Sequence, residues 1–231
     1  MIMLATMMVS SGFAKDDYKA KMDAFVSNLL GKMTVDEKIG QLNLTICSEF
    51  VSGQINDNST TVRDNLKKGA LGGLFGFKDA KQIKELQKMA VENSRLHIPL
   101  IFGYDVVHGY DVTFPIPLAL SSSWNPNIVE TMARISAKEA ASDGVCWTYA
   151  PMVDICHDAR WGRIAEGAGE DPYLGSVMAK AYIHGFQGDN DLSKNTNIMA
   201  CVKHFALYGA SEAGRDYNTV DMSRQRAFNE Y

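Results

Sequence analysis

From residue 71 onward, short apolar segments alternate with longer segments in which apolar residues recur at helical spacing. The apolar segments predict strands and the amphipathic ones predict helices. Because the strands are apolar on both faces, they are typical of a parallel sheet covered by helices. The sequence therefore predicts an α/β fold, with strands at 71–76, 98–105, 146–154 and 198–205 and helices at 79–94, 125–144 and 171–188.

The residues before this alternating region predict three further helices. Apolar residues gather on one side of 15–32. Thr34 and Glu37 have the spacing of a capping box and predict a helix over 34–42. A short helix at 60–69 is stopped by Gly69.

Polar side chains stand at the ends of three predicted strands. Such residues form the active site of an α/β barrel, at the carboxyl ends of the strands. An open doubly wound sheet also binds its ligand there, but no glycine-rich phosphate motif follows a strand, which disfavours nucleotide binding. The pairs are Asp105 with His108, Asp154 with His157, and Lys203 with His204.

The number of strands limits how much of a barrel is present. An eight-stranded (β/α)8 barrel takes about 250 residues, whereas this 231-residue chain offers only four or five strand candidates. We therefore expect a TIM-type barrel of which only the N-terminal part is present.

Charge and composition exclude several classes of protein. The net charge is -4 without a basic cluster, so no nucleic-acid partner is expected. The histidines and cysteines lack zinc-ligand spacing, and we expect no metal or other cofactor. The four cysteines sit in or beside apolar segments, which favours free thiols for most of them, with a disulfide as the alternative if the chain is exported: Cys47, Cys146, Cys156 and Cys201.

The first 14 residues resemble the end of a secretory signal. An apolar stretch is followed by Gly12, Phe13 and Ala14, with small residues where a signal peptidase reads. We expect cleavage after Ala14, a mature domain over 15–231, a periplasmic or secreted location and no membrane span in the mature chain. A frayed apolar N-terminus is the alternative, since the usual basic residues are absent.

The stretch 158–176 concentrates charged residues. Arg160 and Arg163 flank Trp161, and an arginine suits either a carboxylate or adjacent sugar hydroxyls. We expect one arginine to be held in an ion pair and one to face a ligand. Glu170 and Asp171 precede a helix that starts with proline, so a structural role is expected for both.

Five segments, in order, resemble the N-terminal domain of glycoside hydrolase family 3, most closely its periplasmic β-glucosidase branch. The resemblance runs from about Leu29 to Tyr231. The segments are LLGKMTVDEKIGQLNL (29–44), IPLIFGYDVVHGYDVTFPIPLALSSSWNP (98–126), YAPMVDICHDARWGRIAEGAGEDPYLGS (149–176), ACVKHFALYGA (200–210) and GRDYNTVDMS (214–223).

This resemblance implies a retaining exo-acting β-glucosidase that hydrolyses terminal non-reducing β-D-glucosyl residues of oligosaccharides or small β-glucosides. By motif match, Asp105, Arg163, Lys203 and His204 would bind the hydroxyls of the terminal sugar. The family's nucleophile and acid/base fall outside the matched motifs, so no catalytic residue is expected in these 231 residues. The isolated chain is expected to be inactive and to aggregate, because a half-closed barrel exposes strand edges.

Two departures and two alternatives stay open. Asp111 stands where relatives commonly carry arginine or lysine, and Ala168 where they often carry an aromatic residue that would narrow the site. A β-xylosidase of the same family and a non-catalytic sugar-binding relative are the alternatives. The β-N-acetylglucosaminidase branch is disfavoured, because its P-G-H-G-type loop is absent here. The oligomeric state is not predicted.

Lys203 and His204 pose a geometric problem. Neighbours on a regular strand point to opposite faces, yet the resemblance gives both a place around one sugar. Since relatives have non-proline cis peptides near this point, we expect a distorted backbone that brings both side chains to one site.

Overall fold

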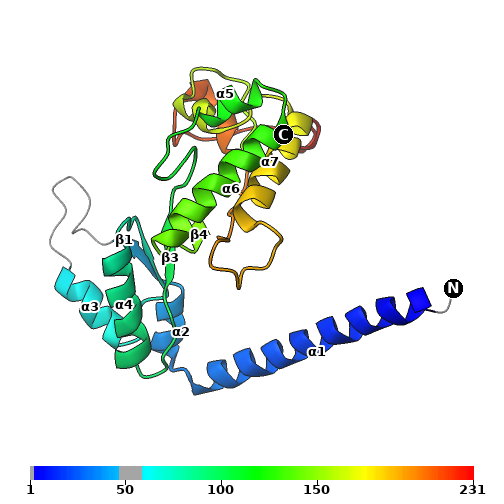
Figure 1. Cartoon of the computed structure of the whole chain (residues 1–231). Coiled ribbons are helices and arrows are strands. Elements are labelled where there is room, and N and C mark those ends of the chain that lie inside the picture. Colours follow the sequence, from blue (N-terminus) through cyan, green and yellow to red (C-terminus); the bar gives the residue numbers. More distant parts are fainter. Residues whose placement is uncertain (1–2, 47–58) are drawn as a thin grey trace.

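A four-stranded parallel sheet organises the chain. The computed structural model describes residues 3–46 and 59–231, and the sheet has the sequential order β1-β2-β3-β4 (Figure 1). Neighbours pair in parallel, for example Thr45 with Leu74 and Leu74 with Phe102. The strands are β1 (Leu44–Ile46), β2 (Gly73–Phe75), β3 (Ile101–Tyr104) and β4 (Trp147–Thr148).

Helices alternate with these strands as the hydrophobic pattern predicts. Asp79, Asn125 and Asp171 cap α4, α6 and α7 through their side chains. Thr34 and Glu37 form the predicted capping box of α2. The helices are α1 (Met3–Lys32), α2 (Val35–Gln41), α3 (Ser59–Lys67), α4 (Ala80–Asn93), α5 (Pro117–Ser121), α6 (Pro126–Ser142), α7 (Pro172–Gln187) and α8 (Arg224–Glu230).

Two parts of the fold differ from the pattern. The three-residue strand β1 and the five-residue helix α5 are too short to produce a periodic signal, and neither was predicted. The predicted strand 198–205 was wrong as a continuous element. It contributes single parallel bridges, Met199 with Trp147 and Lys203 with Met152, beside β4.

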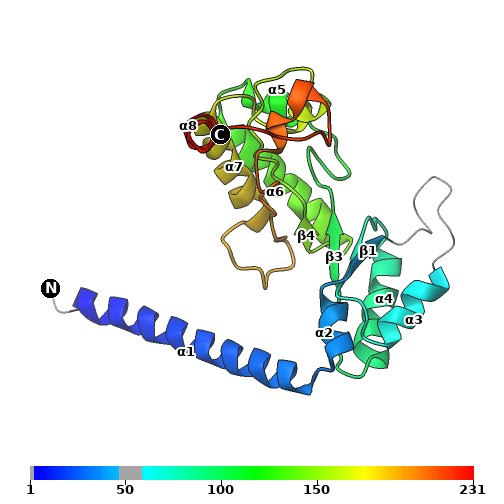
Figure 2. The ribbon, with the colours of Figure 1, turned by 180° about the vertical axis from the view of Figure 1, so that it is seen from behind.

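The core lies between the sheet and its helices. Leu74 and Phe102 of the strands and Val129 of α6 are all but inaccessible to solvent. The helices α6 and α7 lie side by side in both views (Figures 1 and 2). Gly185 permits this close approach, since a Cβ there would lie 2.5 Å from the Cβ of Ala133.

The helix α1 projects away from the rest of the chain (Figure 2). It includes the predicted helix 15–32 and extends back to Met3, so the proposed cleavage point after Ala14 falls within it. Its apolar residues Met22, Phe25 and Leu30 are exposed. No helix in the described ranges is long and apolar enough to cross a membrane.

The sheet leaves apolar strand residues in contact with solvent. Leu44, Ile46 and Ile101 are each more than 40% exposed, at 42%, 45% and 41%. Strand residues of a closed barrel are packed inside it or covered by helices. The exposed strand residues therefore agree with a partial barrel.

Candidate functional site

The four predicted sugar-binding residues come from three segments that follow the strands. Asp105 directly follows β3. Arg163 lies in the 3-10 helix η2 (Gly162–Glu166), in the long connection after β4. Lys203 forms the last bridge beside Met152, and His204 follows it. All four thus lie toward the carboxyl ends of the parallel strands, where an α/β barrel carries its active site.

Asp105 and Lys203 form an ion pair across the sheet. The Lys203 ammonium donates to the Asp105 carboxylate over 3.1 Å. Asp105 is 44% exposed in its side chain and Lys203 only 15%. The two residues are 98 positions apart, so Asp105 is engaged by a distant segment and not only within its own turn.

Arg163 and Glu166 form a two-bond ion pair in η2. Arg163 Nε and Nη2 donate to the two Glu166 oxygens over 2.7 and 2.8 Å. This pair raises the pKa of Arg163 and lowers that of Glu166. The charge of Lys203 lowers the Glu166 pKa further, so Arg163 and Lys203 both act on this one carboxylate.

His204 is anchored by Asp154, which follows the bridged residue Met152. One oxygen, Asp154 Oδ2, lies 2.8 Å from His204 Nδ1 and accepts the His204 backbone N–H over 3.1 Å. The Asp154 side chain is 1% exposed, whereas that of His204 is 33% exposed. The buried Asp154 side chain thus holds the more exposed His204 in position.

The predicted departure from a regular strand is confirmed. The peptide bonds Lys203–His204 and Phe205–Ala206 are both cis. Lys203 contacts Asp105 on one neighbouring segment, and His204 contacts Asp154 on another. That both side chains reach one sugar stays a prediction.

Tyr208 links the arginine to the histidine, and sequence reasoning missed it. Its ring meets the His204 ring edge-on at 4.8 Å between centroids and lies 5.4 Å from the Arg163 guanidinium carbon. Its hydroxyl donates to Asp216 over 2.6 Å, as does the Trp161 indole over 2.9 Å. Burial and then this bond raise the Tyr208 pKa to about 12. The 3-10 turn that places Tyr208 gives no periodic signal.

The other charged residues of 158–176 have local, structural partners. Arg160 pairs with Asp158 two positions away and is 72% exposed in its side chain. Asp171 caps α7, as expected. Glu170 Oε2 lies 3.9 Å from His157 Nδ1. Arg160 and Arg163 both have carboxylate partners, so the structural role expected for one arginine fits the exposed Arg160, and a ligand-facing Arg163 stays a prediction.

The two remaining strand-end histidines do not join this cluster. His108 contacts the Phe114 carbonyl within its own turn, at 3.0 Å. His157 packs edge-on against Tyr231. The described parts of the chain hold no group of three or more His, Cys, Asp or Glu side chains suited to a metal ion.

Asp111 and Ala168, the two residues that depart from the family pattern, both contact other parts of the fold. Asp111 pairs with Lys78 over 2.9 Å. Ala168 packs against the core and lines a cavity of about 10 Å³ next to Glu166. Cys146, Cys156 and Cys201 are free thiols, as favoured, while Cys47 lies outside the described residues.

This arrangement suits a neutral, hydroxyl-rich ligand. Asp105 accepts hydrogen bonds, Lys203 and Arg163 donate them, and His204 has one ring nitrogen beyond its bond to Asp154. Because the basic and acidic groups are already paired with each other, the cluster presents both donors and acceptors without a large excess of either charge. Sugar hydroxyls use both.

Comparisons with known proteins agree with this reading. Residues 34–231 match the model of the glycosyl hydrolase family 3 N-terminal domain. The chain is 49% identical over 209 residues to a periplasmic β-glucosidase of Salmonella typhimurium, covering 90% of this chain and 26% of that enzyme. It is 32% identical to a putative β-xylosidase of Formosa agariphila, covering 93% and 31%. It therefore spans about a quarter to a third of these relatives' length.

Solved structures place the fold in the same group. The β-glucosidase of Listeria innocua in complex with isofagomine superposes with a TM-score of 0.81 at 42% identity, covering 89% of this chain and 28% of that one. The same enzyme with glucose gives a TM-score of 0.80 at 40% identity, covering 90% and 30%. The predicted α/β barrel, present as its N-terminal part, is thereby confirmed.

Proposed function

The chain belongs to glycosyl hydrolase family 3, and we propose from this that the protein is a retaining, exo-acting β-glucosidase. It removes terminal non-reducing β-D-glucosyl residues from oligosaccharides or small β-glucosides. The observation that carries the proposal is the cluster of Asp105, Arg163, Lys203 and His204 at the carboxyl ends of the strands. The name of the Salmonella relative supports the same activity.

In this proposal the cluster binds the terminal sugar. Asp105 accepts hydrogen bonds from two neighbouring hydroxyls, while Lys203 and Arg163 donate to hydroxyl oxygens. Such charge-assisted bonds are the stronger ones. Glu166 holds Arg163, and Asp154 holds His204, in place before the sugar arrives, which reduces the entropy lost on binding.

Hydrolysis with retention requires two further carboxyl groups, a nucleophile and an acid/base, about 5–5.5 Å apart. We assign neither role to a residue of these 231. Asp154, Asp158, Glu166 and Asp216 are each engaged with a basic or aromatic side chain, as described above. The two catalytic groups are expected from the remaining length that the relatives possess.

A β-xylosidase is the second candidate, favoured by the names of two Formosa agariphila relatives at 32% and 35% identity. The product of the complete gene should hydrolyse p-nitrophenyl β-glucoside faster than the β-xyloside, with the anomeric configuration retained by NMR. Faster xyloside hydrolysis would favour the second candidate. Glucose binding without turnover of either substrate would indicate a non-catalytic sugar-binding relative.

We also propose export with cleavage after Ala14, supported by the apolar start and by two relatives named as periplasmic. N-terminal sequencing of the mature protein should begin at Lys15. An intact N-terminus in the cytoplasm would contradict export.

The 231-residue chain alone is predicted to show no glucosidase activity and to aggregate, because strand residues such as Ile46 and Ile101 are exposed. Light scattering and a nitrophenyl glucoside assay test this. Turnover by the purified 231-residue chain would refute it.

A further inference from the structure

The Asp154–His204 contact has a chemical consequence for the sugar site. Asp154 Oδ2 lies 2.8 Å from His204 Nδ1, and the Asp154 side chain is 1% exposed. An ionised carboxylate only accepts hydrogen bonds, so the ring nitrogen facing it must carry a hydrogen. In the neutral ring the other nitrogen, Nε2, is then an acceptor.

Two further contacts fix the direction of the ring. Asp154 Oδ2 also accepts the His204 backbone N–H over 3.1 Å, so one oxygen holds both the ring and the backbone of His204. The Tyr208 ring meets the imidazole edge-on, and Tyr208 is itself held by Asp216. Among the side chains that the structure describes, at residues 17–46 and 62–231, Nε2 has no hydrogen-bond partner, and the His204 side chain is 33% exposed.

We propose that Asp154 is a positioning residue that keeps His204 in its Nδ1–H form and presents Nε2 as a hydrogen-bond acceptor for one sugar hydroxyl. That the partner of Nε2 is a sugar hydroxyl rests on the proposed function, whereas the positioning of the His204 ring by Asp154 does not. In this arrangement Lys203 and Arg163 donate to the sugar, and His204 joins Asp105 in accepting from it.

Positively charged donors are already present around His204. Arg163 is paired with Glu166, and Lys203 is paired with Asp105. Lys203 and Arg163 can only donate hydrogen bonds, whereas Nε2 of the neutral ring accepts one. A sugar hydroxyl can donate to Nε2. A sugar that carries an ether oxygen or a hydrogen at the same carbon cannot.

Solid-state ¹⁵N NMR of the complete gene product, labelled at histidine and without sugar, tests the positioning first. The His204 signal is assigned by its loss in His204→Gln. We expect hydrogen on Nδ1 in the wild type near pH 7.5. Asp154→Asn should retain this form, because the amide oxygen still accepts from both His204 groups, and Asp154→Ala should lose it. Asp158→Ala, which removes the carboxylate that pairs with exposed Arg160, is the matched control.

A wild-type spectrum with hydrogen on Nε2 would overturn the proposal, even in an active glucosidase. The same form in wild type and Asp154→Ala would also overturn it. If Asp154→Ala does not fold, the wild-type and Asp154→Asn spectra still decide.

Binding of glucose and its monodeoxy analogues then tests the role of Nε2. One analogue should bind about tenfold more weakly than glucose to the wild type, as expected for one lost hydrogen bond. In His204→Gln or Asp154→Ala that discrimination should disappear, whereas a purely structural role would weaken all analogues equally. The predicted ring form in a protein that binds no glucose would contradict the proposed function while leaving the positioning supported.

Discussion

The two ends of the parallel sheet carry charged clusters of different design. Before the strands, Glu37 of α2 receives two hydrogen bonds from Arg95, and Arg95 also donates to the Lys32 carbonyl. After the strands, Asp105 pairs with Lys203 and Arg163 with Glu166. The Glu37 side chain is 9% exposed and that of Asp105 is 44% exposed.

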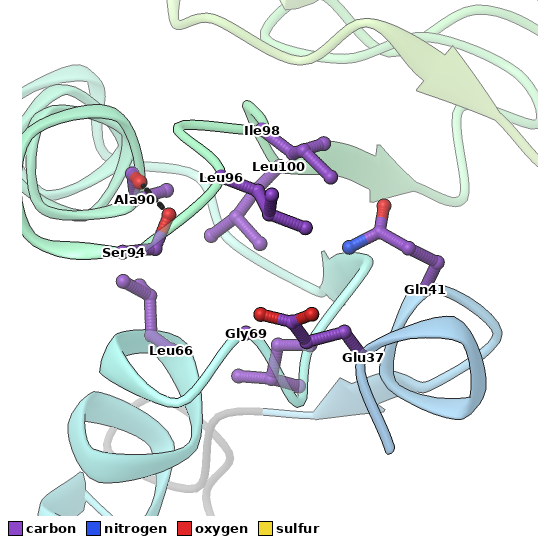
Figure 3. A pocket seen from close by; sticks show the side chains of 10 residues that line it. Glu37, Gln41, Leu66, Gly69, Ala90, Ser94, Leu96, Ile98 and Leu100 are labelled. Carbon is purple, nitrogen blue, oxygen red and sulfur yellow. Dashed lines mark hydrogen bonds between the residues drawn. The ribbon is translucent and has the colours of Figure 1, made fainter. Parts of the chain in front are cut away.

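The difference lies in what each carboxylate has left to bind. Glu37 also accepts the Thr34 backbone N–H over 2.8 Å, so both of its oxygens are engaged. Its carboxylate points into a cavity of about 10 Å³ lined otherwise mostly by apolar side chains (Figure 3), which is no larger than one water molecule needs. Asp105 has one lysine partner and an exposed side chain. The Glu37 end thus stabilises the fold, and the Asp105 end is available to a ligand.

Asp105→Ala gives the largest expected effect. It removes charge-assisted hydrogen bonds to two sugar hydroxyls, each worth about 1.5–3 kcal/mol, so kcat/KM for nitrophenyl glucoside should fall by roughly 100-fold or more. The melting temperature should fall less than in Glu37→Ala, because the Asp105 side chain is 44% exposed and that of Glu37 is 9% exposed. Steady-state kinetics and calorimetry of the complete gene product check both. A large loss of stability with unchanged kcat/KM would reverse the roles of the two ends.

Glu37→Ala is the converse change. It removes the capping-box acceptor and the partner of Arg95, so the melting temperature should fall by several degrees while kcat/KM for the remaining folded protein stays the same. Asp36→Ala, an exposed neighbour in the same helix turn, is the matched control. Equal melting temperatures for the two variants would show that the Glu37 cluster is not a stabilising one.

Acid should reduce the stability that the Glu37 carboxylate gives to the fold. Hydrogen bonds from Arg95 and then from Thr34 lower the Glu37 pKa to about 2. Because the folded-state pKa lies below the unfolded value of about 4.3, this group stabilises the fold above that value. Its contribution is lost as the pH falls toward 2. The free energy of unfolding should therefore fall less steeply below pH 4 in Glu37→Gln than in wild type, as urea titrations would show. Parallel curves would contradict the assignment.

Arg160→Ala is expected to have the smallest effect and to separate the two arginines of one loop. Arg160 is 72% exposed and pairs with Asp158 two positions away, so the melting temperature should barely change and kcat/KM should change by less than twofold. Arg163→Ala should lower kcat/KM at least tenfold. Equal losses of activity would mean that the loop, rather than the Arg163 side chain, serves the site.

The sequence predicted the parts that depend on local pattern. The helices α4, α6 and α7 follow from apolar periodicity and from caps such as Asp79 and Asn125, which act within a few residues. The capping box of Thr34 and Glu37 is local in the same way. The Arg95 partner of Glu37 lies 58 residues away and has no local signal.

The four residues that the resemblance assigns to sugar binding lie in one cluster, but the contacts that hold them there could not be predicted. Asp105, Arg163, Lys203 and His204 came from motif resemblance. Their partners Asp154, Tyr208 and Asp216 depend on how segments meet in space, and a 3-10 turn or a single bridge leaves no periodic trace. The segment 198–205 failed as a strand for the same reason, since its apolar composition resembles a strand and its pairing is limited to single bridges.

A crystal structure of the complete gene product with glucose would show directly whether the cluster at the strand ends binds the sugar. We expect a terminal sugar at the carboxyl ends of the strands, with hydroxyl oxygens about 3 Å from Asp105, Lys203, Arg163 and His204 Nε2. We expect no sugar in the Glu37 cavity. Glucose bound elsewhere, with the Asp105–Lys203 pair unchanged and covered by solvent, would show that the cluster is not the sugar site.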